Sequence, residues 1–422
     1  MKRLFAFRLG TLFVGVVLLS GCSAYTVGNM KLNRKDYDAA IAHYREDLSQ
    51  NPDHWQARER LGFAYLKTGQ LDEAIAELSK VLEQEPGDSY ATFYLGLAWL
   101  SKGERGKAIE TWKTYRNGAQ PLVEQEIKRQ VTLLEISESL HLAKESLADE
   151  EKLQATPPKP GTVAVFYFKD LSADRSLRQL QKALAMMIIT DLSQIRSLQV
   201  VERLRVQFLL AEMGLGQTGL VDEGTAPRAG RLLGAENLIV GTMEPGSLEV
   251  KASVASTSKR DVLGAFSLTA EEQEFFELQK EIVFNIVKVL GISLTPEEKE
   301  LLGTYHTKNF QAVVYFGQAL DALDAGQWEE ARDFFQKALE EDPDFLLARW
   351  GAEACPDASA PSIGELEAMS VGEFSTLTES ALTRAEKEQQ AEHASVADEG
   401  GEGEAQAQGE EGETTGSVSV GW

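Results

Sequence analysis

The stretch that decides the fold begins at Gly161 and continues through the apolar run TVAVFYF to Phe168. It follows the helix-breaking segment TPPKP at 156–160, so a new domain is expected to start here. A continuous apolar run of this length suits a strand that is buried on both faces. Two further apolar runs, LQVV at 198–201 and LIVG at 238–241, are separated by segments with helical spacing. This alternation predicts an α/β domain.

The second half of this domain predicts a hairpin. Residues 248–256 alternate between apolar and polar side chains, and 261–268 form a second strand across the turn TSKR at 257–260. Adding an antiparallel hairpin to strands that alternate with helices gives a mixed sheet. We therefore expect an α/β domain over 161–303 with a mixed sheet.

Two capping signals are expected near the end of the domain. Thr269 and Glu272 have the spacing of a capping box that opens a helix with an apolar stripe. Thr295 and Glu298 have the same spacing, with Pro296 at the first helical position. The sequence predicts a helix after each signal.

Four motifs of this domain carry a family resemblance. They are Val163–Phe166, Val200–Arg203 (VVER), Leu210–Met213 (LAEM) and Leu233–Gly241 (LGAENLIVG). Together they resemble the CsgG-type curli-secretion domain family. The family's CsgG itself is a lipoprotein that assembles into an outer-membrane secretion pore, so the resemblance implies an envelope or curli assembly role.

The predicted hairpin bears on which role applies. Strands that cross an outer membrane present an apolar face to the lipid. The hairpin at 248–268 is short and carries Lys251, Lys259, Arg260 and Asp261. The sequence therefore favours a scaffold in the assembly of an envelope or secretion machine. A component of a CsgG-like outer-membrane secretion pore is the alternative.

A repeat of 34 residues precedes this domain, over 22–122. Small residues recur at that step, and so do prolines: Gly28, Gly62 and Gly96; Ala40, Ala74 and Ala108; Pro52 and Pro86. Glycine and alanine let two helices of a hairpin approach closely, and proline ends the second helix. The period and residue types resemble the tetratricopeptide repeat, in three units.

Such arrays form a groove that binds an extended segment of a partner protein. The alternative is that three units only brace the central domain, and the groove-lining residues cannot be assigned from one sequence. A helix and a proline-rich linker are expected over 123–160.

One more repeat unit is expected over 304–350. Its Gly326, Ala331 and Pro343 take the positions of the glycine, alanine and proline in the N-terminal units. An isolated unit cannot bury its apolar face. It must dock on the central domain, on the N-terminal array or on another subunit. We expect an acidic, mostly disordered tail over 351–422, with a transient helix near 365–390.

The N-terminus has the pattern of an export signal over 1–21. Basic residues precede the apolar run Leu9–Leu19, which is too short to span a bilayer. The sequence LSGC at 19–22 resembles a bacterial lipobox, which implies lipidation of Cys22 as the mature N-terminus. By the same resemblance, Ser23 after the cysteine implies the outer membrane, on the periplasmic side. An ordinary secretory signal with an incidental cysteine is the alternative.

The net charge and the cysteine content limit the classes of molecule that the protein is expected to bind. The net charge of −24 argues against nucleic acid, whose phosphates need clustered lysine and arginine. The expected partners are proteins, held in the repeat groove, and the membrane, through the lipid anchor; a homo-oligomer is also open. The only other cysteine, Cys355, has no intramolecular partner once Cys22 is acylated.

Signals for catalysis are weak. The segment GLGQTG at 214–219 spells a dinucleotide fingerprint, but it follows a predicted helix instead of a strand. The five histidines lack metal-ligand spacing. Asp191, Glu202 and Arg203 are expected to form structural ion pairs. The sequence predicts no enzyme and assigns no catalytic, cofactor or metal residue.

Overall fold

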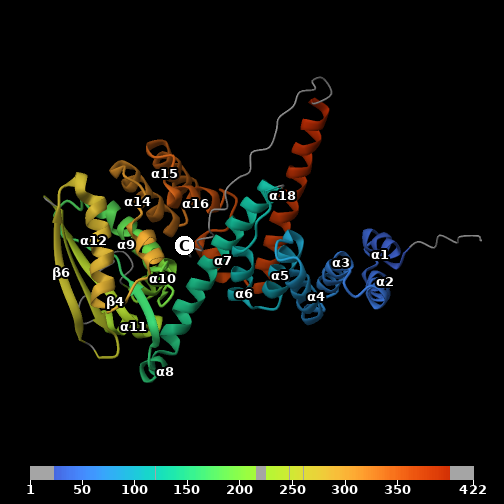
Figure 1. The fold of residues 1–422 in the computed structure, drawn as a ribbon, viewed down its shortest axis with the longest axis horizontal. Coiled ribbons are helices and arrows are strands. Elements are labelled where there is room, and N and C mark those ends of the chain that lie inside the picture. Colours follow the sequence, from blue (N-terminus) through green and yellow to red (C-terminus); the bar gives the residue numbers. More distant parts are fainter. Residues whose placement is uncertain (1–22, 119, 215–224, 247, 260, 400–422) are drawn as a thin grey trace, which may run out of the picture. The chain divides into compact units, whose positions relative to one another are not determined.

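The computed structural model describes residues 23–118, 120–214, 225–246, 248–259 and 261–399. The chain divides into two compact units, residues 1–98 and 99–422, each described here by itself (Figure 1).

The first unit consists of paired antiparallel helices. They are α1 (Ala24–Asn33), α2 (Tyr37–Gln50), α3 (Trp55–Lys67), α4 (Leu71–Gln84) and most of α5 (Ser89–Ser101). The recurring glycines sit where the helices of one pair meet. A Cβ atom added to Gly62 would lie 2.6 Å from Cγ of Leu78, and one added to Gly28 would lie 2.6 Å from the Tyr44 ring. Only glycine allows this approach, so the predicted hairpin packing is confirmed.

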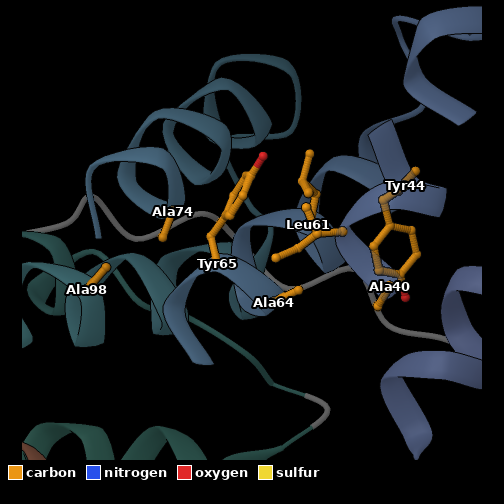
Figure 2. Close-up of a cluster of buried hydrophobic side chains, with 9 residues drawn as sticks. Ala40, Tyr44, Leu61, Ala64, Tyr65, Ala74 and Ala98 are labelled. Carbon is orange, nitrogen blue, oxygen red and sulfur yellow. The ribbon is translucent and has the colours of Figure 1, made fainter. Parts of the chain in front are cut away.

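The core of these helices contains both small and large buried side chains (Figure 2). Ala40, Ala64 and Ala74 are fully buried and leave room for Tyr44 and Tyr65. The Tyr44 hydroxyl donates a hydrogen bond of 2.7 Å to Oδ1 of Asn29, which satisfies its polar end. Each fully buried large side chain contributes roughly 1.5–3 kcal/mol.

The second unit is built around a mixed sheet. Its strands are β1 (Lys159–Val165), β2 (Lys169–Asp170), β3 (Gln199–Val200), β4 (Ala235–Glu244), β5 (Leu248–Ser256) and β6 (Val262–Ala270). The strand order is β3-β1-β4-β5-β6, with β2 also paired to β4. β3, β1, β2 and β4 are parallel where they pair, whereas β4, β5 and β6 are antiparallel. The predicted α/β domain, its mixed sheet and its hairpin are confirmed.

Helices pack on this sheet or, in the case of the last one, on two of the other helices. They are α9 (Arg178–Leu192), α10 (Arg203–Glu212), α11 (Ala226–Leu233), α12 (Phe275–Val289) and α13 (Pro296–Gly303). α12 contacts β5, β6 and α9, while α11 contacts β4. The capping box of Thr295 and Glu298 is confirmed at α13. The one expected at Thr269 is wrong, because β6 continues through that residue and a 3₁₀ turn (Glu272–Glu274) precedes α12.

The C-terminal repeat docks on the central domain. It consists of α14 (Phe310–Asp324) and α15 (Trp328–Glu341), and α14 packs along α9. The two helices approach so closely that a Cβ atom on Gly317 would lie 1.8 Å from the carbonyl oxygen of Gln179. Of the three docking surfaces that the sequence left open, the structure uses the central domain.

The long helix α7 (Pro121–Ala148) organises the remaining helices of this unit. It contacts α6 (Arg105–Lys113), α10, α11 and α8 (Glu150–Ala155). It also contacts α16 (Leu346–Ala354), α17 (Ile363–Ala368) and α18 (Val371–Glu399). In Figure 1, α18 runs beside α7.

The segment 351–399 therefore differs from the mostly disordered tail that the sequence predicts. The side chains of Phe374 and Leu382 in α18 are buried. The Thr378 hydroxyl donates a 3.0 Å hydrogen bond to Oε1 of Gln130 on α7. Packing against α7 supplies the apolar contacts that the tail lacks within its own sequence. Residues 400–422 lie outside the described part of the chain.

Candidate functional site

A cluster of aromatic side chains joins α3 and α5 in the first unit. We define the aromatic patch as Phe63, Tyr90 and Tyr94, all half-buried. The rings of Phe63 and Tyr94 lie 4.6 Å apart between centroids, and those of Tyr90 and Tyr94 lie 6.3 Å apart and stacked. Lys67 Nζ lies 5.4 Å from the centre of the Phe63 ring. Partly exposed aromatic rings beside a cation suit contact with another protein.

Sequence reasoning did not find the aromatic patch, although a signal existed. One repeat earlier, Tyr90 and Tyr94 correspond to Gln56 and Arg60, which are polar. An aromatic residue that breaks the 34-residue pattern is not needed for the packing common to all units.

A buried carboxyl group lies on the same helix as Phe63. Glu59 is only 4% exposed, and its Oε1 lies 3.6 Å from Nε of Arg60. Burial raises the pKa of Glu59 to about 7, although the Arg60 charge opposes the shift. This carboxyl group therefore changes its protonation near neutral pH.

A buried ionic network connects the central domain to the C-terminal repeat. Nη1 of Arg203, on α10, donates a hydrogen bond of 2.7 Å to Oδ2 of Asp324 on α14. It donates a second one of 3.2 Å to the hydroxyl oxygen of Tyr167. Lys182 Nζ lies 2.8 Å from the same Asp324 oxygen and 2.6 Å from Oδ1 of Asp321. We call these five residues the Arg203 junction.

Electrostatics within the Arg203 junction are strongly coupled. Burial alone would raise the pKa of Asp324, but the Arg203 and Lys182 charges outweigh burial and lower the pKa. Burial alone would lower the pKa of Arg203, and Asp324 reverses that effect so that the pKa is raised. The shifts in pKa keep Asp324, Arg203 and Lys182 charged near neutral pH, and the network holds α14 in place.

Asp191 belongs to a separate network. Its carboxylate accepts hydrogen bonds of 2.8 and 3.0 Å from Lys280 Nζ and of 2.8 Å from Gln279 Nε2. His306 Nε2 lies 2.9 Å from Oδ1 of Asp191. Burial lowers the pKa of Lys280, although the Asp191 charge opposes the shift. The sequence grouped Asp191 and Arg203 with Glu202, but in the structure Asp191 pairs with Lys280 and Arg203 pairs with Asp324.

Of the two cysteines, the structure describes only Cys355. Cys22, the predicted lipidation site, lies outside the described residues. Cys355 is buried, its Sγ lies 3.4 Å from the carbonyl oxygen of Trp328, and burial raises the pKa of its thiol to about 11. A buried thiol with this pKa stays protonated and is a poor nucleophile.

Three features that the sequence raised can be compared with the described part of the chain. No cluster of three or more His, Cys, Asp or Glu residues there is arranged to hold a metal ion. Most of the GLGQTG segment lies outside the described residues, and Gly214 follows α10. Among the helices that are described, none is long and apolar enough to cross a membrane.

Comparisons with known proteins identify the modules. The family model of Curli production assembly/transport component CsgG matches residues 144–264. Two tetratricopeptide repeat models match residues 32–95 and 312–345. No curated protein matches the chain.

Among solved structures, a tetratricopeptide repeat protein from Parabacteroides merdae ATCC 43184 is 14% identical with a TM-score of 0.25. The match covers 78% of this chain and 96% of that one. Yeast Tom70 is 15% identical with a TM-score of 0.26, over 77% of this chain and 63% of Tom70. These likenesses are too low to support an argument beyond the family matches. The chain therefore carries tetratricopeptide repeats on either side of a domain of the CsgG family, the curli production assembly/transport component family.

Proposed function

We propose that this protein is a non-enzymatic scaffold that binds proteins through its N-terminal repeats during assembly of an envelope or secretion machine. The aromatic patch carries this proposal. Repeats of this family mediate protein–protein interaction, and the patch supplies partly exposed rings on two neighbouring helices, α3 and α5. The CsgG-family domain associates the protein with an envelope process.

The proposal is tested by affinity purification of the tagged full chain from crosslinked envelopes. We compare the wild type with the variant Phe63→Ala/Tyr94→Ala and with the control Lys80→Ala/Gln84→Ala, whose side chains are exposed on α4. We expect the patch variant to lose a partner that the wild type and the control retain, with helical content unchanged by circular dichroism. An unchanged set of partners in the patch variant would contradict the proposal.

Location is part of the proposal. We propose that the lipidated Cys22 anchors the protein in the outer membrane, on the periplasmic side. The lipobox pattern at 19–22 and the family's association with that membrane support it. Acyl chains contribute about 0.8 kcal/mol per buried CH₂, so two or three chains hold a protein firmly.

The anchor gives a direct prediction. Cys22→Ser removes the thiol that would be acylated, so the exported protein should move from the membrane fraction to the soluble periplasmic fraction. Cell fractionation followed by immunoblotting measures this, with Cys355→Ser as the control that stays in the membrane fraction. Retention of the Cys22→Ser protein in the membrane would show that another segment holds it.

The alternative function is a component of a CsgG-like secretion pore, which the family match favours. The hairpin of β5 and β6 argues for the scaffold. Both strands pair within the domain's own sheet, and α12 packs on them. The face away from α12 carries Glu249, Lys251 and Ser267, and the first two are joined by an ion pair of 3.4 Å. Charged side chains on that face suit water and not lipid.

A further inference from the structure

A lysine occupies a glycine position in the first repeat unit. In the other units, the residue after the first helix is Gly69, Gly103 or Gly326, with φ of 74°, 87° and 71°. One repeat before Gly69, the corresponding residue is Lys35, with φ of 59°. This left-handed conformation is free for glycine and unfavourable for lysine, whose Cβ atom crowds the backbone. The fold itself therefore gives no reason for a lysine here.

Lys35 and its neighbour Arg34 form a cationic turn between α1 and α2. Both side chains are exposed, and neither forms an ion pair or a side-chain hydrogen bond with any described residue. The nearby Lys31 pairs with Asp36 at 3.1 Å, and Asp38 is the one further carboxylate between residues 31 and 38. The turn thus carries three cations against two carboxylates, in a chain whose net charge is −24.

The outward face of α1 continues this surface without any acidic residue. Thr26, Met30 and Asn33 are exposed and share one face of the helix, since they are four and three residues apart. The side chains of Tyr25 and Leu32 pack against the core of the unit instead. Met30 is 45% exposed, and α1 contains no Asp or Glu. An apolar side chain among neutral polar ones, with cations beside it, suits contact with lipid headgroups.

The proposed lipid anchor would bring this face to the membrane. Ser23 is the N-cap of α1, and its Oγ accepts a 3.2 Å hydrogen bond from the Thr26 N–H, so no linker separates Cys22 from the helix. A helix of ten residues is about 15 Å long, so the turn lies within about 20 Å of the anchor. Attraction to anionic headgroups acts over about 8–10 Å, which favours α1 lying along the membrane.

We propose that the outward face of α1, with Arg34 and Lys35 at its end, lies on the membrane and binds the phosphates of anionic phospholipid headgroups. The proposal rests on the proposed acylation of Cys22, because the anchor holds an otherwise acidic protein at an anionic surface. The two cations contact headgroup phosphates, and Met30 contacts the apolar region beneath them. This contact fixes which side of the first unit faces the membrane.

An environment-sensitive fluorophore tests the contact in the full lipidated chain. In a Cys355→Ser background, the label NBD is attached at Met30→Cys or, as the control, at Ala42→Cys on exposed α2 positions. The chain is reconstituted into phosphatidylcholine vesicles with or without phosphatidylglycerol. We expect emission at residue 30 to rise at least about twofold and shift to shorter wavelength with phosphatidylglycerol, while the label at residue 42 does not distinguish the vesicles.

The outcomes separate this inference from the anchor. A chain that does not float with the vesicles refutes the anchor, and the inference falls with it. A chain that floats, but whose label at residue 30 ignores phosphatidylglycerol, overturns the inference alone. A label that responds only when envelope proteins are added also overturns it, because the occupant is then an acidic protein.

The variant Lys35→Gly separates lipid contact from folding. Because glycine adopts the φ of this turn freely, the melting temperature should not fall, while the response of the residue 30 label to phosphatidylglycerol should drop at least about twofold. Lys80→Gln removes one positive charge from an exposed site on α4 and should leave that response unchanged. Equal responses in the two variants contradict the inference. A lower melting temperature in Lys35→Gly would show that the lysine serves the fold.

Discussion

Asp324 is the carboxylate that Arg203 and Lys182 share in the Arg203 junction. Its side chain is 3% exposed and contacts both Arg203 and Lys182. Asp324→Ala leaves the buried Arg203 without its carboxylate partner, a change that typically costs about 3–5 kcal/mol. Chemical denaturation should show that loss.

The control for this prediction lies one helical turn earlier. Asp321 also contacts Lys182, but its side chain is 28% exposed. Asp321→Ala should therefore lower the free energy of unfolding by less than about 1 kcal/mol. Equal losses for the two variants would mean that the Arg203 junction does not hold the repeat.

Glu59 gives a pH dependence with a definite sign. Its pKa is raised from 4.5 to about 7 in the folded protein. The folded state therefore binds the proton more tightly than the unfolded state, and the first unit loses stability as the pH rises from about 4.5 to 7. Glu59→Gln removes this penalty of about 3 kcal/mol at pH 8 and changes little at pH 4.5.

Hydrogen exchange of the amides in α3 measures the effect of Glu59→Gln locally. Exchange should slow at pH 8, after correction for the intrinsic rate, and Glu73→Gln at an exposed position of α4 should have no such effect. Faster exchange in Glu59→Gln at pH 8 would show that the carboxylate stabilises the fold instead.

Residues differ in how far the sequence reveals them. Gly28 and Gly62 were predictable, because their spacing repeats and their role is steric. The pairing of Arg203 with Asp324 was not, since 121 residues separate them and no local pattern reports such a contact. The aromatic patch was predictable in part. The sequence shows that Tyr90 and Tyr94 depart from the repeat pattern, but it does not show that their rings contact each other and Phe63.

At the scale of elements, α18 shows how a distant partner orders a segment. Its buried residues Phe374, Leu382 and Ala385 have helical spacing, but the surrounding sequence is polar and acidic. Alone, such a stripe is too narrow to hold a helix. The sequence therefore predicted only a transient helix at 365–390, because no local sequence pattern indicates that α7 packs against these buried residues.

Phe374→Ala tests this packing. The side chain is 1% exposed, and its truncation should cost about 3–5 kcal/mol because a cavity forms beside α7. Limited trypsin digestion at Arg384 and Lys387 should then become faster. Thr383→Ala, at an exposed position on the same helix, is the control and should leave the cleavage rate unchanged. Equal cleavage rates in Phe374→Ala and the wild type would argue against a docked α18.

The elements of the central domain were largely predictable, because buried strands and amphipathic helices have strong periodic signals. β1, β4 and the hairpin of β5 and β6 lie where the apolar runs and alternation place them. The start of α12 was not predictable, since Thr269 and Glu272 match a capping box while the β5 ladder keeps Thr269 in β6.

At the scale of the whole molecule, the central claim is that the protein assembles with others and does not conduct. The repeats and the CsgG-family domain were identifiable from the sequence because each has a periodic or motif-based signature. Scaffold and pore share those signatures. The observation that supports our proposal of a scaffold is three-dimensional: β5 and β6 belong to the domain's own sheet and present charged side chains on the face away from α12.

Electrical recording tests that claim most directly. The purified, lipidated full chain is added to a planar lipid bilayer alongside a known channel protein as the positive control. Our account predicts that membrane current stays at the level of protein-free bilayers over the concentrations at which the chain binds the membrane. Discrete channel openings that depend on this protein, and that disappear when it is heat-denatured, would contradict the scaffold and establish the pore.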